Sequence, residues 1–338
     1  MTMPKPRESL RTLSEALLDP RLAPEQVASL IDQLHDLFQG LIPVSGRAPG
    51  SFAHQVAVPT AHGMALGLSH AAACLLDYQR TWLLLRGLWA AVAEVRQERP
   101  GQPVRIFYAG CGPFAPWVTL VAPLFSPEEV QFTVLEINAE SLKMARHLIG
   151  ALELDAYVEA YHQADAITFT IPEPERFQIL FTETLDALLY RESYVPILWN
   201  LLPQLPDAVR VVPHNVTLEL SWLSPPAGDP QTEAPGETHA ATLFDTRAAV
   251  DALAQATALP EAFPERRYSF PDRAAYFGLV LDTVVHIHGN LTLTRGQSSL
   301  TLPASYTLPS PEQGTGLAFW YQLKPSVELK MQVVSMSK

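Results

Sequence analysis

The sequence has few cysteines, few basic residues and no long hydrophobic run. Its 338 residues include only two cysteines, Cys74 and Cys111. That number excludes a disulfide framework and a cysteine-based metal site, and it is typical of a reducing cytoplasm. The formal net charge is −12, from 23 Lys and Arg against 35 Asp and Glu. This balance argues against a nucleic-acid partner, which needs a basic face, and it suits either a cationic ligand or solubility alone.

Membrane and secretion signals are also missing from the sequence. No apolar run reaches the roughly 20 residues of a membrane-spanning helix, and the first residues lack the apolar core of a secretory signal. We therefore expect a cytoplasmic protein without a membrane partner. The hydrophobic fraction is 48%, which is ordinary for a folded protein, and the length allows two domains after a helical preface.

The hydrophobic pattern divides the chain into three regions. Residues 1–100 show apolar residues at helical spacing, including a long helical region over Met64–Gln97. In residues 101–208, short apolar runs alternate with helical segments, and this β-α-β order predicts a mainly parallel sheet in a Rossmann-like domain. The strands expected there are Ile106–Ala109, Phe132–Leu135, Val158–Gln163 and Phe177–Thr182. The predicted fold class is therefore α/β.

Residues 209–338 predict a β-rich, barrel-like domain because several short strand patterns follow one another. The expected elements are a loop over Ser224–Ala240, a helix over Thr246–Ala258, and strands over Val209–Val212, Val216–Trp222, Tyr276–Thr294, Ser298–Leu302 and Gly316–Leu323.

The residues that point to a ligand follow the ends of the predicted parallel strands. Gly110 and Gly112 follow the first strand, and Glu136 ends the second. Such glycines let the backbone approach a nucleotide, and such an acid can accept hydrogen bonds from the ribose hydroxyls. Ala115 stands where G-x-G-x-x-G has its third glycine, so the turn fits NAD as well as S-adenosylmethionine. Asp165 and Glu183 follow later strands, which places the ligand at the carboxyl edge of the sheet.

Several motifs together resemble the protein arginine methyltransferase family, over roughly Met64–Thr217. They are Asp77-Tyr-Gln-Arg80-Thr81, Ala109-Gly-Cys-Gly112, Leu135-Glu136, the stretch Thr182–Glu192 with Glu183 and Glu192 at the spacing of that family's double-glutamate loop, and Val212-Pro213. The resemblance implies S-adenosylmethionine as the cofactor, no metal, arginine methylation and a homodimer. It implies that Arg80 holds the methionine carboxylate, that Gly110 and Gly112 form the cofactor turn, that Glu136 binds the ribose and that Asp165 lies near the adenine. It makes Glu183 and Glu192 the catalytic pair.

The sequence also departs from the family pattern. Tyr108 replaces an acid at the end of the first strand, and Phe114 replaces a glycine of the turn. No Thr-His-Trp loop is present, and the nearest segment has Phe319 in place of the histidine. These departures favour a small acceptor, such as free L-arginine or an arginine-like molecule or peptide in a biosynthetic pathway, over protein arginine. They also leave open a different amine or hydroxyl acceptor, and a catalytically inactive cofactor-binding subunit.

The chemistry explains why a guanidine would need two acids. Two carboxylates can bind a guanidinium in fork geometry and draw its positive charge toward the nitrogens that do not attack. His286 and His288 are candidate acceptors of the released proton, although ordinary strand residues are the alternative. Each site residue also has a structural interpretation, such as an ion pair for Arg80 and a loop cap for Asp165. Glu183 and Glu192 can share a site only on a loop, because on one straight helix they would face opposite sides.

Overall fold

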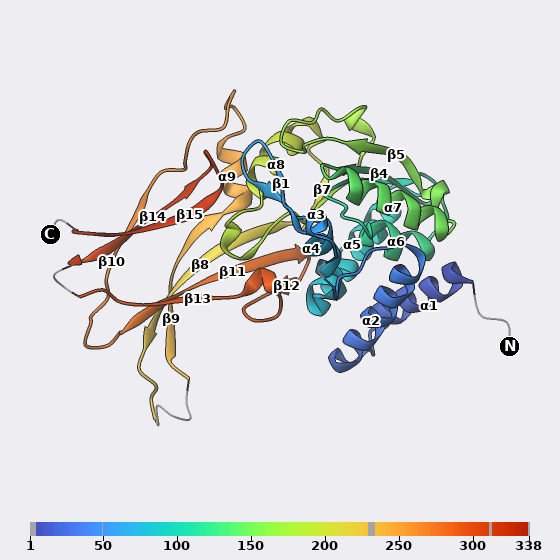
Figure 1. Ribbon diagram of the computed structural model, residues 1–338. Helices are drawn as coiled ribbons and strands as arrows, with labels where there is room; N and C mark the ends of the chain where they lie inside the picture. Colours follow the sequence, from blue (N-terminus) through green and yellow to red (C-terminus); the bar gives the residue numbers. More distant parts are fainter. Residues whose placement is uncertain (1–4, 49, 229–233, 311–312, 337–338) are drawn as a thin grey trace.

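The molecule combines a parallel sheet flanked by helices with an antiparallel, β-rich C-terminal region, which confirms the predicted α/β class (Figure 1). The computed structural model describes residues 5–48, 50–228, 234–310 and 313–336. Among these residues, no helix has both the length and the apolar character to span a bilayer.

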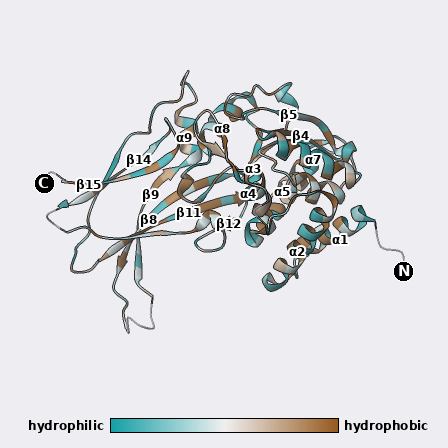
Figure 2. Ribbon diagram, viewed as in Figure 1, coloured by the Kyte–Doolittle hydropathy of each residue, from teal (hydrophilic) through white to brown (hydrophobic). Residues whose placement is uncertain are grey.

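The N-terminal third is mainly helical. Its elements are α1 (Pro6–Leu18), α2 (Pro24–Leu41), α3 (Phe52–Gln55), the short strands β1 (Val58–Pro59) and β2 (Met64–Ala65), α4 (Leu68–Ala73), the 3₁₀ turn η1 (Cys74–Leu76) and α5 (Tyr78–Glu98). In α2 the buried residues Val27, Ile31, Leu34 and Phe38 recur every three to four positions, as one apolar helix face requires. Both α1 and α2 carry hydrophilic and hydrophobic residues (Figure 2), and they pack against α5.

The central sheet contains five parallel strands in the order β5-β4-β3-β6-β7. The strands are β3 (Val104–Ala109), β4 (Val130–Glu136), β5 (Val158–Gln163), β6 (Ile179–Thr182) and β7 (Arg210–Val212), with helices α6 (Pro116–Val121), α7 (Ala139–Ala151) and α8 (Tyr194–Leu201) between them. The central strand β3 is almost wholly buried, as expected when helices cover both faces of a parallel sheet. The chain order reverses beside β3, which is the position where such sheets bind ligands.

The C-terminal region contains two antiparallel sheets. One is formed by β8 (Asn215–Ser224), β9 (Gly236–Asp245), β11 (Gly278–His288), β12 (Leu291–Leu293) and β13 (Ala304–Thr307), and the other by β10 (Arg266–Ser269), β14 (Gly316–Gln322) and β15 (Glu328–Val334). Helix α9 (Thr246–Ala252) contacts β8, β9 and α8. The β-rich character predicted from the sequence is thus confirmed.

Three local predictions in this chain were wrong. The helical region predicted over Met64–Gln97 begins only at Leu68, because Met64 and Ala65 form the second strand of a short hairpin. Residues 236–240 of the expected loop belong to β9, while residues 229–233 of that loop lie outside the described residues. Ser298–Leu302 contains the 3₁₀ turn η7 (Ser299–Thr301) where a strand was expected, because the Ser298 side chain caps that turn.

Candidate cofactor and acceptor site

Three of the predicted site residues lie side by side because their strands are in register. Ala109 pairs with Leu135 of β4 on one side and with Thr182 of β6 on the other. The next residue of each chain segment is Gly110, Glu136 or Glu183. The parallel sheet therefore brings a glycine turn and two carboxylates to one carboxyl edge.

The glycine turn uses backbone geometry that glycine alone adopts easily. Gly110 has φ +80° and Gly112 has φ +60°, in the left-handed region where a Cβ atom is costly. At Gly110 space is limiting too, because an added Cβ would lie 2.4 Å from Cγ2 of Thr184. The turn thus comes into direct contact with the loop that follows β6. Ala115 also has a positive φ of 41° just before α6 begins at Pro116.

Glu136 is buried and held by two backbone amides. Oε2 accepts a hydrogen bond from Gly112 N at 2.8 Å, and Oε1 accepts one from Asn138 N at 2.9 Å. Burial raises the pKa of the carboxyl, and these amides oppose the shift. Each carboxylate oxygen has a second lone pair. One lone pair on each oxygen is therefore left for a diol, which fits a ribose.

Arg80 and Glu183 form a buried ion pair with each other. Arg80 Nε donates to Oε2 of Glu183 at 3.0 Å, and Nη2 contacts the same oxygen. The Glu183 side chain is 5% exposed, and its Oε1 is a buried atom without a hydrogen-bond partner in the described part of the chain. Burial raises the pKa of Glu183 to about 7 although Arg80 opposes the shift. Arg80 thus forms the ion pair that was its alternative, structural role. Arg80 and Glu183 also line the cleft.

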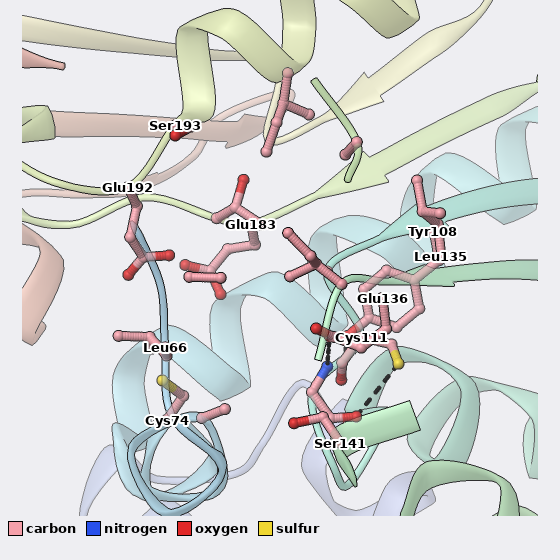
Figure 3. A pocket seen from close by; sticks show the side chains of 18 of the residues that line it. Leu66, Cys74, Tyr108, Cys111, Leu135, Glu136, Ser141, Glu183, Glu192 and Ser193 are labelled. Atoms are coloured by element: carbon pink, nitrogen blue, oxygen red, sulfur yellow. Dashed lines mark hydrogen bonds between the residues drawn. The ribbon is translucent and has the colours of Figure 1, made fainter. Parts of the chain in front are cut away.

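Glu192 reaches the same cleft from the far end of the loop. Figure 3 shows its carboxylate next to that of Glu183, close to Leu66 and Cys74. Glu192 is half-buried, and no group in the described part of the chain donates a hydrogen bond to its carboxylate. Burial, with the negative charges of Glu183 and Asp186, raises the pKa of Glu192 to about 8. The two glutamates thus face a common cavity, as the acid-pair prediction requires.

The loop from residue 183 to residue 192 is shaped by contacts with the C-terminal sheets. Leu188 and Leu189 have φ of 58° and 53°, which is costly for leucine. Thr283 Oγ1 accepts a hydrogen bond from Leu188 N at 2.7 Å, and Tyr321 donates its hydroxyl to Leu189 O at 2.9 Å. Because the segment is a loop with one 3₁₀ turn, η5 (Ala187–Leu189), its two ends can face the same side.

The segment 58–66, here called the strap, was not predicted from the sequence and lies along the cleft. The Thr60 and Ser193 hydroxyls are 3.1 Å apart, Met64 N donates to Arg191 O at 3.4 Å, and Thr60, Met64, Ala65 and Leu66 line the cavity. Gly63 permits this close contact, because a Cβ there would lie 2.6 Å from Arg191 O and from Ser193 Oγ.

Asp165 anchors the strap. Its Oδ2 accepts a hydrogen bond from Ala61 N and its Oδ1 one from Ile167 N, both at 2.9 Å. Asp165 also lines the cavity, so the carboxylate has a structural role at the place where the adenine contact was predicted.

The two histidine candidates lie elsewhere. His288 Nε2 is 3.0 Å from Glu94 Oε1, and His286 Nε2 is 3.5 Å from Thr217 Oγ1. Neither lines the cleft, so the hypothesis that one of them takes the proton is wrong. His288 contacts α5, and His286 contacts β8, the strand with which β11 pairs. Phe319 lies in β14 and lines a separate cavity beside α9.

The cleft gathers all of the other predicted site residues around one cavity. The empty space of the cleft, including the part open to solvent, is about 1040 Å³. Arg80, Gly110, Gly112, Glu136, Asp165, Glu183 and Glu192 all line it. In the described residues, including those of the cleft, no group of three or more His, Cys, Asp or Glu side chains could hold a metal ion.

Comparisons with known proteins return solved structures alone. No protein-family model matches the chain, and no curated protein matches it. The chain is similar to a Trypanosoma brucei PRMT1 enzyme-prozyme heterotetrameric complex with AdoHcy, with 10% identity, coverage of 76% of this chain and 90% of that chain, and a TM-score of 0.48. It is also similar to Arabidopsis thaliana protein arginine methyltransferase 10, with 11% identity, coverage of 78% and 97%, and a TM-score of 0.48.

Proposed function

We propose that the protein is an S-adenosylmethionine-dependent N-methyltransferase that methylates a guanidine group. The proposed acceptor is free L-arginine or an arginine-like small molecule or peptide, ahead of protein arginine. The observation that carries the proposal is the pair Glu183 and Glu192, whose carboxylates lie together in one cleft with the glycine turn and Glu136. Such a pair suits a planar cation with several N–H donors.

The cofactor assignment rests on the residues at the strand ends. Gly110 and Gly112 would carry the backbone past the nucleoside, Glu136 would bind the ribose hydroxyls, and Asp165 would lie near the base. Arg80 would bind the cofactor carboxylate while keeping its contact with Glu183. When bound, S-adenosylmethionine supplies a methyl group on a positively charged sulfur.

The two acids would then make one guanidine nitrogen reactive. Glu183 has one oxygen on Arg80 and one without a partner, so it would accept N–H groups of the acceptor through Oε1. Glu192 would accept the neighbouring N–H groups. Together they would hold positive charge on the nitrogens that do not attack. As the new N–C bond forms and the S–C bond breaks, the attacking nitrogen loses a proton, and Glu192 is the proposed acceptor.

The test is to replace Glu183 and Glu192 separately with Gln, with the exposed Glu140→Gln of α7 as a matched control. Methyl transfer to L-arginine is measured by mass spectrometry, and S-adenosylmethionine binding by calorimetry. Losing a charged contact made in the transition state costs roughly 10²–10³ in rate. We expect at least about a 100-fold loss for both variants, with cofactor binding retained. Turnover that survives both substitutions would contradict the proposal.

A catalytically inactive cofactor-binding subunit is the second candidate. The Arg80–Glu183 ion pair favours it, since this contact already satisfies two groups assigned to ligands. Cofactor binding without methyl transfer to any guanidine, amine or hydroxyl acceptor would support that candidate. The glycine turn also fits NAD, and calorimetry with NAD in parallel tests whether NAD is the cofactor instead of S-adenosylmethionine. The homodimer and the domain boundaries after residues 100 and 208 remain predictions.

A further inference from the structure

A second cavity lies beside the loop that carries the two glutamates. This groove has an empty volume of about 950 Å³, including the part open to solvent. The loop contributes Asp186, Leu188, Tyr190 and Arg191 to the groove, whereas it contributes Glu183, Thr184 and Glu192 to the cleft. The loop thus borders both cavities, and Arg191, which lines the groove, directly precedes Glu192, which lines the cleft.

Arg191 offers a free positive charge in this groove. Its backbone is fixed, because Arg191 N donates to the Asp186 carboxylate at 3.1 Å and its carbonyl accepts from Met64 N. Its guanidinium lies 5.1 Å from the centre of the Tyr190 ring. Among the described residues it makes no ion pair, although the protein carries a net charge of −12. An exposed arginine beside an aromatic ring is well suited to a carboxylate, which it can bind through two parallel hydrogen bonds.

A carboxylate from another element completes the groove. Glu328, at the start of β15, lines it and contacts Lys330 through one oxygen, Oε2. Tyr306, Leu329 and Met331 also line the groove and supply apolar surface. The groove thus offers a cation, an anion and an apolar wall.

We propose that this groove binds the amino-acid end of the acceptor, with Arg191 on the α-carboxylate and Glu328 on the α-ammonium. The inference rests on the proposed function and restricts the class of acceptor molecules. The acceptor class becomes free amino acids with a guanidine side chain, because an arginine inside a polypeptide has uncharged amides in place of both groups. The apolar wall would contact the methylene stem.

The experiment compares four acceptors with each enzyme form. They are L-arginine, its decarboxylated analogue agmatine, a desamino analogue that keeps the carboxylate, and an arginine amide acetylated at its amino group. The enzyme forms are the full chain, Arg191→Met, Arg191→Lys and Glu328→Gln. Arg86→Met is the matched control, because Arg86 also lies against a ring, that of Trp82 at 5.2 Å, and lines neither cavity.

Losing a charge-assisted hydrogen bond costs about 1.5–3 kcal/mol, which is roughly 10- to 150-fold. Arg191→Met is therefore expected to raise KM for L-arginine about 10- to 100-fold with kcat little changed, and to leave KM for agmatine unaffected. Arg191→Lys should restore part of the loss. Glu328→Gln should raise KM for L-arginine and leave the desamino analogue unaffected.

Two results would overturn the inference, and they are distinguishable. If the full chain methylates all four acceptors equally well and Arg191→Met changes none of them, the groove assignment fails while the proposed function stands. If the full chain methylates no guanidine although it binds the cofactor, the proposed function fails and the groove assignment fails with it.

Discussion

At Gly110 the glycine turn, residues 110–112, contacts the loop of residues 183–192, here called the acid loop. A side chain there would need an unfavourable φ of +80° and would also collide with Thr184. Gly101 separates the two effects, because it has a similar φ of +78° but nothing within 4 Å of an added Cβ.

We predict that Gly110→Ala lowers the thermal midpoint and weakens S-adenosylmethionine binding at least about 10-fold, whereas Gly101→Ala causes only the roughly 1 kcal/mol backbone penalty. Thermal denaturation and calorimetry measure both effects. Thr184→Ser removes the methyl group that Cβ would meet and should restore part of the loss in Gly110→Ala. Equal effects at both glycines would show that the close approach is unimportant.

The two acids give the site a pH dependence with a defined sign. The pKa values of Glu183 and Glu192, about 7 and about 8, are raised from the ordinary value of 4.5. The folded protein therefore binds these protons more tightly than the unfolded chain does. Their contribution to stability is fully present below about pH 4.5 and is lost as the pH rises through 7 and 8. A guanidinium, in contrast, needs both groups ionised.

We predict that the affinity for L-arginine rises between pH 6 and pH 9 while the folded protein becomes less stable over the same range. Each pKa unit is worth about 1.4 kcal/mol, so Glu192→Gln should be more stable than the natural chain at pH 9 by at least about 1 kcal/mol and similar to it at pH 5. Calorimetry and thermal denaturation at several pH values measure this, with Glu140→Gln as the control. A flat arginine affinity would contradict the paired-acid site.

The sequence predicted which residues lie at the site better than it predicted which residues contact one another. Gly110, Glu136 and Glu183 could be placed at one sheet edge from the sequence, because each follows an apolar run of strand length. The Arg80–Glu183 pair could not, because the two residues lie in different elements and nothing in the local pattern fixes their distance. The histidines were misplaced for the same reason, since a strand pattern shows which residues share a face but not what that face contacts.

At the scale of elements, the strap is the main part of the site that was not predicted from the sequence. The strap contacts Arg191 of the acid loop and the adjacent Ser193, and Asp165 anchors it. Its two strands have two residues each, which is too short for any periodic signal. The longer strands of the parallel sheet were predictable, because continuous apolar runs alternate with helices.

We predict that Gly63→Ala lifts the strap from the acid loop, because a Cβ would lie too close to Arg191 O and Ser193 Oγ. Amide hydrogen exchange at Ala61 and Met64 should become at least about 10-fold faster, and methyl transfer should fall. Gly40→Ala is the control, since that position near the end of α2 has nothing within 4 Å. Unchanged exchange at Ala61 in Gly63→Ala would refute this role of the strap.

At the scale of the whole molecule, the C-terminal sheets hold the site in shape. Asp77 precedes α5 and accepts hydrogen bonds from Ser298 Oγ, Ser299 N and Ser299 Oγ at 2.7–2.8 Å. Thr283 and Tyr321 fix the acid loop from the same side. The class of both regions followed from the sequence. This attachment did not, because contacts between residues 95 to 222 positions apart leave no local pattern.

The central claim is that the strand ends hold a sulfonium nucleoside while Glu183 and Glu192 hold a guanidine opposite its methyl group. A crystal structure of the full chain with S-adenosylhomocysteine and L-arginine tests it most directly. We predict that the ribose hydroxyls contact Glu136 and that the guanidinium lies between the carboxylates of Glu183 and Glu192. A guanidinium bound elsewhere, or a nucleoside outside this cleft, would contradict the account.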